Sequence, residues 1–213
     1  MTAPTSIAGV QLGYDSSGST GTYSGSWTIN SGSMIAIIVV LNDGGRSVSS
    51  CTLAGQAMTQ AISYLNGDCR TSIYYRLNPP VGSQSVAMSL NLTGRWGVVG
   101  IQMGIVGGTG TAVGNGKSGN TITINGSTTL PDNILICGGC CNTQSITLNS
   151  ATRLASNGGT LRYDVGYISR PTAGSFTVTF SLGSDPAYGA SGAVLPVVGI
   201  FGQQFRILGY PGL

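Results

Sequence analysis

Residues 74–90 read YYRLNPPVGSQSVAMSL, and residues 167–182 read YISRPTAGSFTVTFSL. Each stretch has a Tyr, an Arg, a Pro and a Gly-Ser pair, followed by alternating apolar and polar residues that end in Ser-Leu. A period of two is typical of a β-strand with one buried face and one solvent-exposed face. The two stretches therefore predict two strands of the same kind, one in each half of the chain.

The similarity extends on both sides of these stretches, as an internal repeat requires. The segment WTIN at 27–30 corresponds to ITIN at 122–125, and VGI at 99–101 corresponds to VGI at 198–200. The offset varies from 92 residues (Leu90 to Leu182) to 99 residues (Val99 to Val198), as loops of different length would cause. We expect two similar halves of about six strands each.

These segments predict the organisation of the whole chain. Turn-forming residues separate the alternating segments at short intervals, and no long stretch shows a helical period. The predicted fold class is all-β: an antiparallel, jelly-roll-like β-sandwich built from two similar halves. We expect it to consist of an N-terminal arm at 1–20, the β-sandwich at 21–202 with halves at about 21–106 and 119–201, and a C-terminal tail at 203–213.

Two arrangements of the halves fit the repeat: two small sandwiches in tandem, or one two-layer sandwich with pseudo-twofold symmetry. We favour the second, because the Gly-rich segment 107–120 resembles a short crossing loop and no charged or Pro-rich linker occurs there.

One segment departs from the alternation of apolar and polar residues. The run MIAIIVVL at 34–41 is apolar on both faces, which indicates a central strand that is covered on both sides.

The composition argues against an enzyme. The chain has no His, no Glu, a single Lys and six Asp, and His is the commonest general base. Charged residues make up 7%, against roughly 25% in an average domain. We expect no cofactor and an uncharged surface that lies against something else.

The eight Arg are scattered, and no apolar run reaches the ~20 residues of a membrane span, so we expect neither nucleic-acid nor membrane binding. Residues 1–6 do not resemble a signal peptide.

The five cysteines are an odd number, so at least one is unpaired within the chain. Cys137 and Cys140 have the CxxC spacing of a zinc site, which would need a second ligand pair. Cys51 and Cys69 could supply that pair, or form a disulfide, only if the fold brought them together. We favour buried free thiols and no metal.

Other candidate sites are weak. Residues 114–118 (GNGKS) lack the full spacing of a phosphate-binding loop and precede a strand pattern, so we expect a mobile loop there. Asp43, Asp68, Asp132 and Asp185 neighbour turn residues and are predicted to support turns. Trp27 and Trp96 could form a glycan-stacking platform, but aromatic residues in strands more often fill the core.

The C-terminal segment is apolar for a chain terminus and has no counterpart in the first half. Its side chains are the candidate partner-binding residues: Phe205, Arg206, Ile207, Leu208 and Tyr210. Two interpretations of this segment are open. It docks on a neighbouring subunit, or it packs back on its own sandwich.

The stretches 48–59, 74–90, 131–135 and 172–183 resemble a family of β-sandwich modules found in phage virion proteins and in bacterial surface or secreted proteins. The segment CGGCC at 137–141 departs from that family. The resemblance implies a non-enzymatic binding or assembly module. We expect a virion structural protein of a bacteriophage, such as a capsid decoration (cement) subunit, assembled in the host cytoplasm. Its partners would be the major capsid protein or other virion proteins, and it would form a homo-oligomer. The alternative is a receptor- or glycan-binding module of a phage tail or bacterial cell surface.

Overall fold

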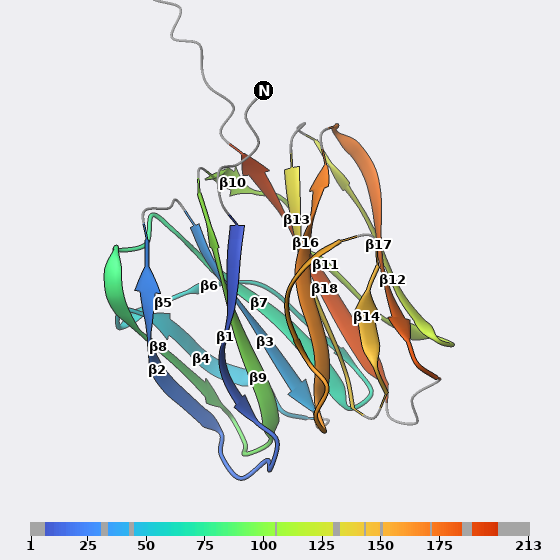
Figure 1. Ribbon diagram of the computed structural model, residues 1–213, viewed down its shortest axis with the longest axis horizontal. Coiled ribbons are helices and arrows are strands. Elements are labelled where there is room, and N and C mark those ends of the chain that lie inside the picture. Colours follow the sequence, from blue (N-terminus) through green and yellow to red (C-terminus); the bar gives the residue numbers. More distant parts are fainter. Residues whose placement is uncertain are drawn as a thin grey trace, which may run out of the picture.

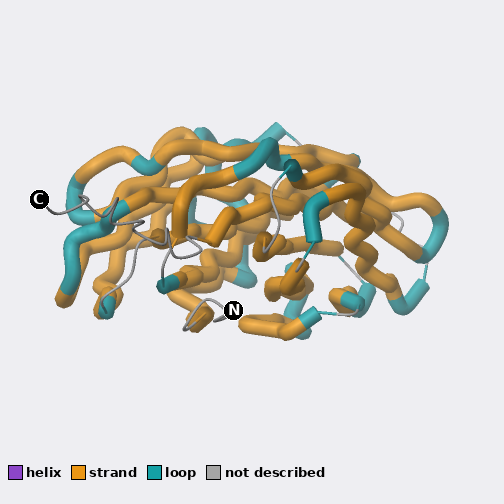
Figure 2. Tube along the Cα trace, turned by 90° about the horizontal axis from the view of Figure 1, so that it is seen from above, coloured by secondary structure: helices purple, strands orange, loops and turns teal. Residues whose placement is uncertain are grey.

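The structure, a computed structural model, describes residues 7–30, 34–42, 45–104, 106–129, 133–142, 144–149, 151–170, 172–184 and 189–199. All regular elements in these ranges are β-strands, as the tube in Figure 2 shows. Neighbouring strands pair antiparallel throughout the described sheets. The predicted all-β, antiparallel fold class is confirmed.

The first half of the chain forms two sheets. Its inner sheet has the order β1-β9-β3-β7-β6, with strands β1 (Ile7–Asp15), β9 (Arg95–Met103), β3 (Met34–Asn42), β7 (Cys69–Leu77) and β6 (Thr59–Asn66). Its outer sheet has the order β2-β8-β4-β5, with strands β2 (Thr22–Ile29), β8 (Gly82–Leu90), β4 (Val48–Leu53) and β5 (Gln56–Ala57).

The second half repeats this arrangement. Its inner sheet has the order β11-β18-β13-β16-β15, with strands β11 (Val113–Ser118), β18 (Ala190–Gly199), β13 (Asn133–Cys141), β16 (Arg162–Arg170) and β15 (Thr152–Asn157). A short strand, β10 (Val106–Thr109), also pairs with β18. Its outer sheet contains β12 (Thr121–Thr128), β17 (Gly174–Leu182) and β14 (Ile146–Leu148), and the end of β11 joins the two sheets by pairing with β12.

Each half has a jelly-roll connectivity, in which the chain crosses repeatedly between two sheets. In the first half the orders β1-β9-β3-β7 and β2-β8-β4 place the first strand beside the last and the second beside the next to last. The second half has the matching orders β11-β18-β13-β16 and β12-β17-β14. The two similar halves and the jelly-roll-like fold that the repeat predicts are therefore present.

The two halves do not share one two-layer sandwich, and that prediction is wrong. Each half buries a core of its own, and the two inner sheets pack on each other through a third core. The result is four layers, which Figure 1 shows from the first outer sheet on the left to the second outer sheet on the right. The cause lies in β3. Ile35, Ile37 and Val39 enter the core of the first half, while Ala36, Ile38 and Val40 enter the core between the halves.

The predicted boundaries also need correction. Residues 7–15 are not part of an N-terminal arm but form β1, which pairs with β9. Residues 107–120 are not a crossing loop, because β10 and β11 lie there and pair with β18. In both segments glycines permit close packing. A Cβ on Gly9 would lie 3.2 Å from Leu154 Cγ, and one on Gly114 would lie 2.7 Å from Tyr64 Cγ. The halves are thus about 7–103 and 106–199.

The contacts between the inner sheets are approximately twofold symmetric. Strand β3 lies on its counterpart β13, and β7 lies on β18. At the edges β1 contacts β15, and β6 contacts β11. Because β1 corresponds to β11 and β6 corresponds to β15, exchanging the halves reproduces these edge contacts, and the contact of β3 with β13 is its own counterpart. The contact of β7 with β18 has no equally close counterpart between β16 and β9, so the two sandwiches are related by a twofold axis only approximately.

Candidate functional site: two uncharged outer faces

The two outer sheets present faces made almost entirely of hydroxyl side chains. Their inner faces carry the apolar residues of the alternation, so the intervening Ser and Thr point to solvent. The first outer face consists of Thr22, Ser24, Ser26, Thr28, Ser50, Thr52, Ser83, Ser85, Ala87 and Ser89. The second outer face consists of Thr121, Thr123, Asn125, Ser127, Thr147, Ser175, Thr177, Thr179 and Ser181. None of these described residues is charged.

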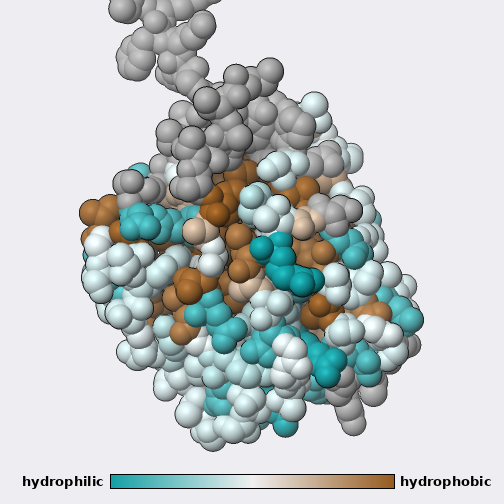
Figure 3. All heavy atoms as spheres, viewed as in Figure 1, coloured by the Kyte–Doolittle hydropathy of each residue, from teal (hydrophilic) through white to brown (hydrophobic). Residues whose placement is uncertain are grey.

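The hydroxyl side chains form cross-strand rows. On the second outer face Thr123 lies opposite Thr179, and Asn125 lies opposite Thr177, whose hydroxyl donates to Asn125 Oδ1 at 2.8 Å. Such pairs contribute about 0.2–1 kcal/mol each to sheet stability. Hydroxyl groups also cost much less to remove from water than charges do. The outer faces are therefore suited to contact with another surface. Figure 3 looks at the edges of the layers, where brown hydrophobic groups and scattered teal residues lie among pale ones.

The described charged side chains lie elsewhere, within the sheets or at their ends. The carboxylate of Asp164 is fully buried and accepts hydrogen bonds from Arg153 Nε at 2.8 Å and from the Leu148 N–H at 2.8 Å. Arg76 donates to the Leu53 carbonyl at 2.8 Å. Because these groups bind within the chain, they support the fold rather than form a charged binding patch.

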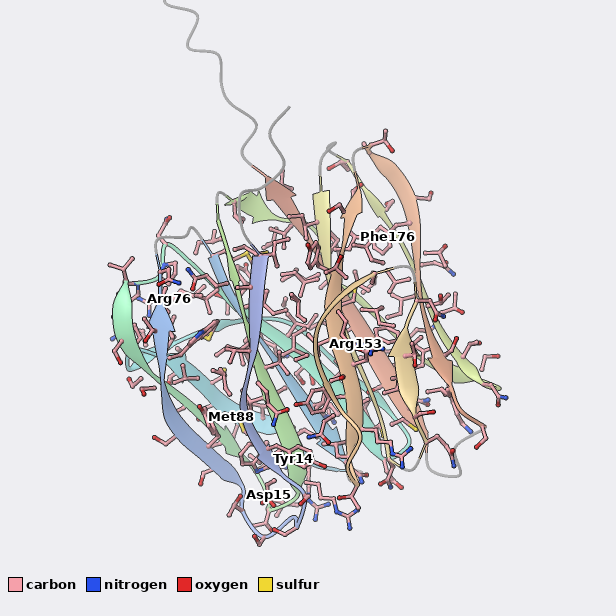
Figure 4. The ribbon with its side chains drawn as sticks, viewed as in Figure 1. Tyr14, Asp15, Arg76, Met88, Arg153 and Phe176 are labelled. Carbon is pink, nitrogen blue, oxygen red and sulfur yellow. The ribbon has the colours of Figure 1, made fainter. Side chains whose placement is uncertain are left out.

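Asp15 organises the turn between β1 and β2, at the tip of the first half in Figure 4. Its carboxylate accepts hydrogen bonds from both the N–H and the hydroxyl of Ser17 and Thr20, and from the Gly18 N–H. Burial alone would raise the pKa of Asp15. The hydrogen bonds from Ser17 and Thr20 outweigh burial and hold that pKa well below its usual range.

All five cysteines are unpaired and buried. Cys51 lies in the core of the first half and Cys69 in the core between the halves, so these two residues face opposite sides of the first inner sheet. Burial raises the pKa of Cys51 to about 12, which leaves it an inert thiol at neutral pH. Cys140 packs with the hydroxyls of Thr71 and Ser191 at 3.5 Å each, inside the inter-half core. Within the described residues no group of three or more His, Cys, Asp or Glu side chains could hold a metal ion.

Both tryptophans pack in or against the core of the first half. Trp96 is 5% exposed, and Tyr23 packs edge-on against it with ring centroids 5.9 Å apart. Trp27 is half-buried and lies over Gly100, where a Cβ would be 2.7 Å from the indole ring. Trp96 is therefore a core residue, while Trp27 stays partly exposed at the side of the first half.

Several cavities occur at the edges of the layers. One of about 430 Å³ lies between the sheets of the second half and is lined by glycines, hydroxyl residues, Pro196, Val113 and Val198. Another of about 360 Å³ lies where the two halves meet, and Arg95 and Arg162 line it. The segment 114–118 lies on β11 and so forms a strand, neither a phosphate-binding loop nor the mobile loop that we expected.

The candidate partner-binding residues Phe205, Arg206, Ile207, Leu208 and Tyr210 lie outside the described residues. So do Asp43, Asp132 and Asp185, while Asp68 lies in the turn between β6 and β7. The outer faces are the site that the sequence reasoning did not single out. The signal was present in the Ser and Thr of each alternating strand, but alternation alone does not tell which sheets end up outside.

No helix in the described part of the chain could cross a membrane. No family model matches the chain, and no curated protein matches it. Among solved structures, an anti-sigma factor domain-containing protein aligns with 86% of this chain and 79% of its own length, at 8% identity and a TM-score of 0.26. A likeness this low identifies neither a family nor a function.

Proposed function

We propose that the protein is a non-enzymatic structural component of a bacteriophage virion, and that it acts as a capsid decoration (cement) subunit. The observation that carries this proposal is the pair of uncharged, hydroxyl-covered outer faces on a four-layer slab. A face without charge loses little on desolvation, so it can lie against a partner over a wide area. Fold alone would not justify the proposal, because one fold hosts many functions.

The partner would be the major capsid protein or another virion protein. In addition to contact through an outer face, the apolar C-terminal tail would act as a second attachment. In this proposal Phe205, Ile207, Leu208 and Tyr210 dock on the neighbouring subunit, and Arg206 donates hydrogen bonds at the rim. Two attachments on one subunit strengthen binding beyond either one alone.

Quantitative mass spectrometry of purified phage particles tests the role. A copy number near that of the major shell protein is expected for a cement subunit. A few copies per particle would point to the alternative, a receptor- or glycan-binding module on the tail, and absence from particles would contradict both.

Truncation after Gln203 tests the tail separately. The expected result is weaker binding to undecorated particles with an unchanged melting temperature, because in this proposal residues 204–213 dock on the neighbouring subunit and not on their own sandwich. If particle binding survives and only the melting temperature falls, the tail packs on its own chain and is not an attachment.

A further inference from the structure

Strand β2 is an open edge of the first outer sheet. Among the described strands only β8 pairs with it, and that pairing is regular over eight residues without a bulge. Edge strands in soluble proteins are ordinarily protected by Lys, Pro, bulges or a covering element. β2 reads TYSGSWTI and contains neither a charge nor a proline.

The direction of its free hydrogen-bonding groups follows from the register. Leu90 N–H donates to the Gly21 carbonyl at 2.7 Å, just before Thr22 pairs with Ser89. Hydrogen-bonded and non-hydrogen-bonded pairs alternate in an antiparallel ladder. The backbone groups of Tyr23, Gly25 and Trp27 therefore face β8. Pointing outward are the N–H and C=O groups of Thr22, Ser24, Ser26 and Thr28.

The structure also shows why this edge stays open. In the second half β11 runs on from β18 to pair with the start of β12, and the Asn115 side chain donates to the Thr123 carbonyl. In the first half β1 ends at Asp15, whose carboxylate binds the N–H groups of residues 17, 18 and 20. This turn carries the chain to the outer sheet before β1 can pair with β2.

The sequence of β2 is symmetric about Gly25: Thr, aromatic, Ser, Gly, Ser, aromatic, Thr over residues 22–28. We infer that β2 is a homodimer interface, in which two copies pair antiparallel about a twofold axis at Gly25. Ser24 then lies opposite Ser26 of the second copy, and Thr22 lies opposite Thr28 of the second copy. Both pairs bring outward-facing backbone groups together, so that each pair exchanges two hydrogen bonds.

The side chains fit this pairing on both faces. On the inner face Tyr23 lies opposite Trp27 of the second copy, an aromatic cross-strand pair. Gly25 lies at the axis, and Tyr23 of the same copy packs over it, since a Cβ on Gly25 would lie 2.8 Å from Tyr23 Cζ. On the outer face only hydroxyl side chains meet, so no like charges oppose each other. A second copy is the occupant that matches this edge, because an isologous contact must be self-complementary.

The dimer would join two first outer sheets into one continuous sheet and so double that uncharged face. The inference concerns the protein in solution and does not depend on the proposed virion role. Its failure would show in the mass of the free protein, whereas failure of the virion role would show in the composition of particles.

Sedimentation equilibrium over a concentration series tests the inference. The wild-type protein is expected to reach twice the 21.6 kDa of one chain. In S24K/S26K, the lysine introduced at position 24 of each copy would lie opposite the lysine introduced at position 26 of the other, so we expect dimerisation to weaken by at least about tenfold. The matched control S83K/S85K places the same charges on the same face but on β8, beyond the ~8 Å over which charge acts at physiological ionic strength.

Amide hydrogen exchange locates the interface without a substitution. Thr22, Ser24, Ser26 and Thr28 should exchange more slowly as the concentration rises through the dimer range, while Ser83 should not change. A protein that stays monomeric at every concentration would overturn the inference. So would a dimer that persists in S24K/S26K, or one in which these four amides exchange quickly, since either result places the contact elsewhere.

Discussion

Gly97 shows how closely the two halves approach each other. It lies on β9, and a Cβ at this position would be 2.7 Å from Tyr163 Cε1 of the second half and 3.0 Å from Val40 Cγ2. Tyr163 cannot easily move away, because its hydroxyl donates to Gln11 Oε1 at 2.6 Å and its ring packs near Tyr14. The contact between the halves therefore requires a glycine at residue 97.

Gly97→Ala is expected to destabilise the protein by about 1–3 kcal/mol through overpacking. The free energy of unfolding in guanidinium chloride measures this change. Gly158→Ala is the matched control, because nothing lies within 4 Å of a Cβ there. Equal stability of the two variants would mean that the inner sheets do not meet at Gly97.

The lowered pKa of Asp15 predicts that the free energy of unfolding depends on pH. Its pKa is lower in the folded state than the value of about 3.9 expected in the unfolded chain. The unfolded state therefore takes up the proton first as pH falls, so the stabilisation by this carboxylate is fully present above about pH 4 and is lost below it. The difference in unfolding free energy between wild type and Asp15→Asn should shrink as pH falls below about 4. A difference that is constant with pH would show that the charge of Asp15 does not contribute.

At the scale of elements, β3 decides how many layers the molecule has. Every residue of this strand is fully buried, so neither of its faces meets solvent. Strand β13 has the same role in the second half, and residues 134–141 of it are buried. Strands of the outer sheets differ, because one of their faces carries Ser and Thr. An inner strand and an outer strand therefore have different hydrophobic patterns.

The two faces of β3 should be equally sensitive to truncation. Ile37→Ala opens a cavity in the core of the first half, and Ile38→Ala opens one between the halves. Each change is expected to cost about 2–5 kcal/mol in thermal or chemical unfolding. Ser83→Ala on the exposed face of β8 is the control and should change stability little. A mild effect of Ile38→Ala alone would contradict the packing of the inner sheets on each other.

At the scale of the whole molecule, the inter-half core makes each half dependent on the other. A first half produced alone would expose the face of β3 that carries Met34, Ala36, Ile38 and Val40. An apolar patch of this kind promotes association. The four-layer slab is thus one unit of stability although each half has a complete jelly-roll connectivity.

Separate production of residues 1–104 and 105–213 tests this dependence. Each fragment alone should aggregate or bind a hydrophobic dye, and mixing the two during refolding should yield a one-to-one complex. Size-exclusion chromatography with light scattering measures the outcome. Two soluble, monomeric fragments that do not associate would show that the inner sheets contribute no interface.

Much of the fold could be predicted from the sequence because alternation and repetition are local signals. Segments such as 175–182 and 85–92 have a period of two that only a half-buried strand requires. The strands β1 and β11 were missed because Gly9, Gly13, Gly114 and Gly116 interrupt their patterns. Those glycines have meaning only against the side chains that pack over them, which lie far away in the chain.

The sequence by itself determined the strand content, the duplicated order of the strands and the low charge, because each depends only on residue types within short segments. Only the tertiary structure decided that the halves are two sandwiches, which sheets lie outside, and that β2 ends as an open edge. The physical reason is that a strand face has the same pattern of apolar residues whichever sheet covers it. The partner of a face depends on contacts between residues such as Ile38 and Gly138, which are far apart in the chain and meet only when the inner sheets pack.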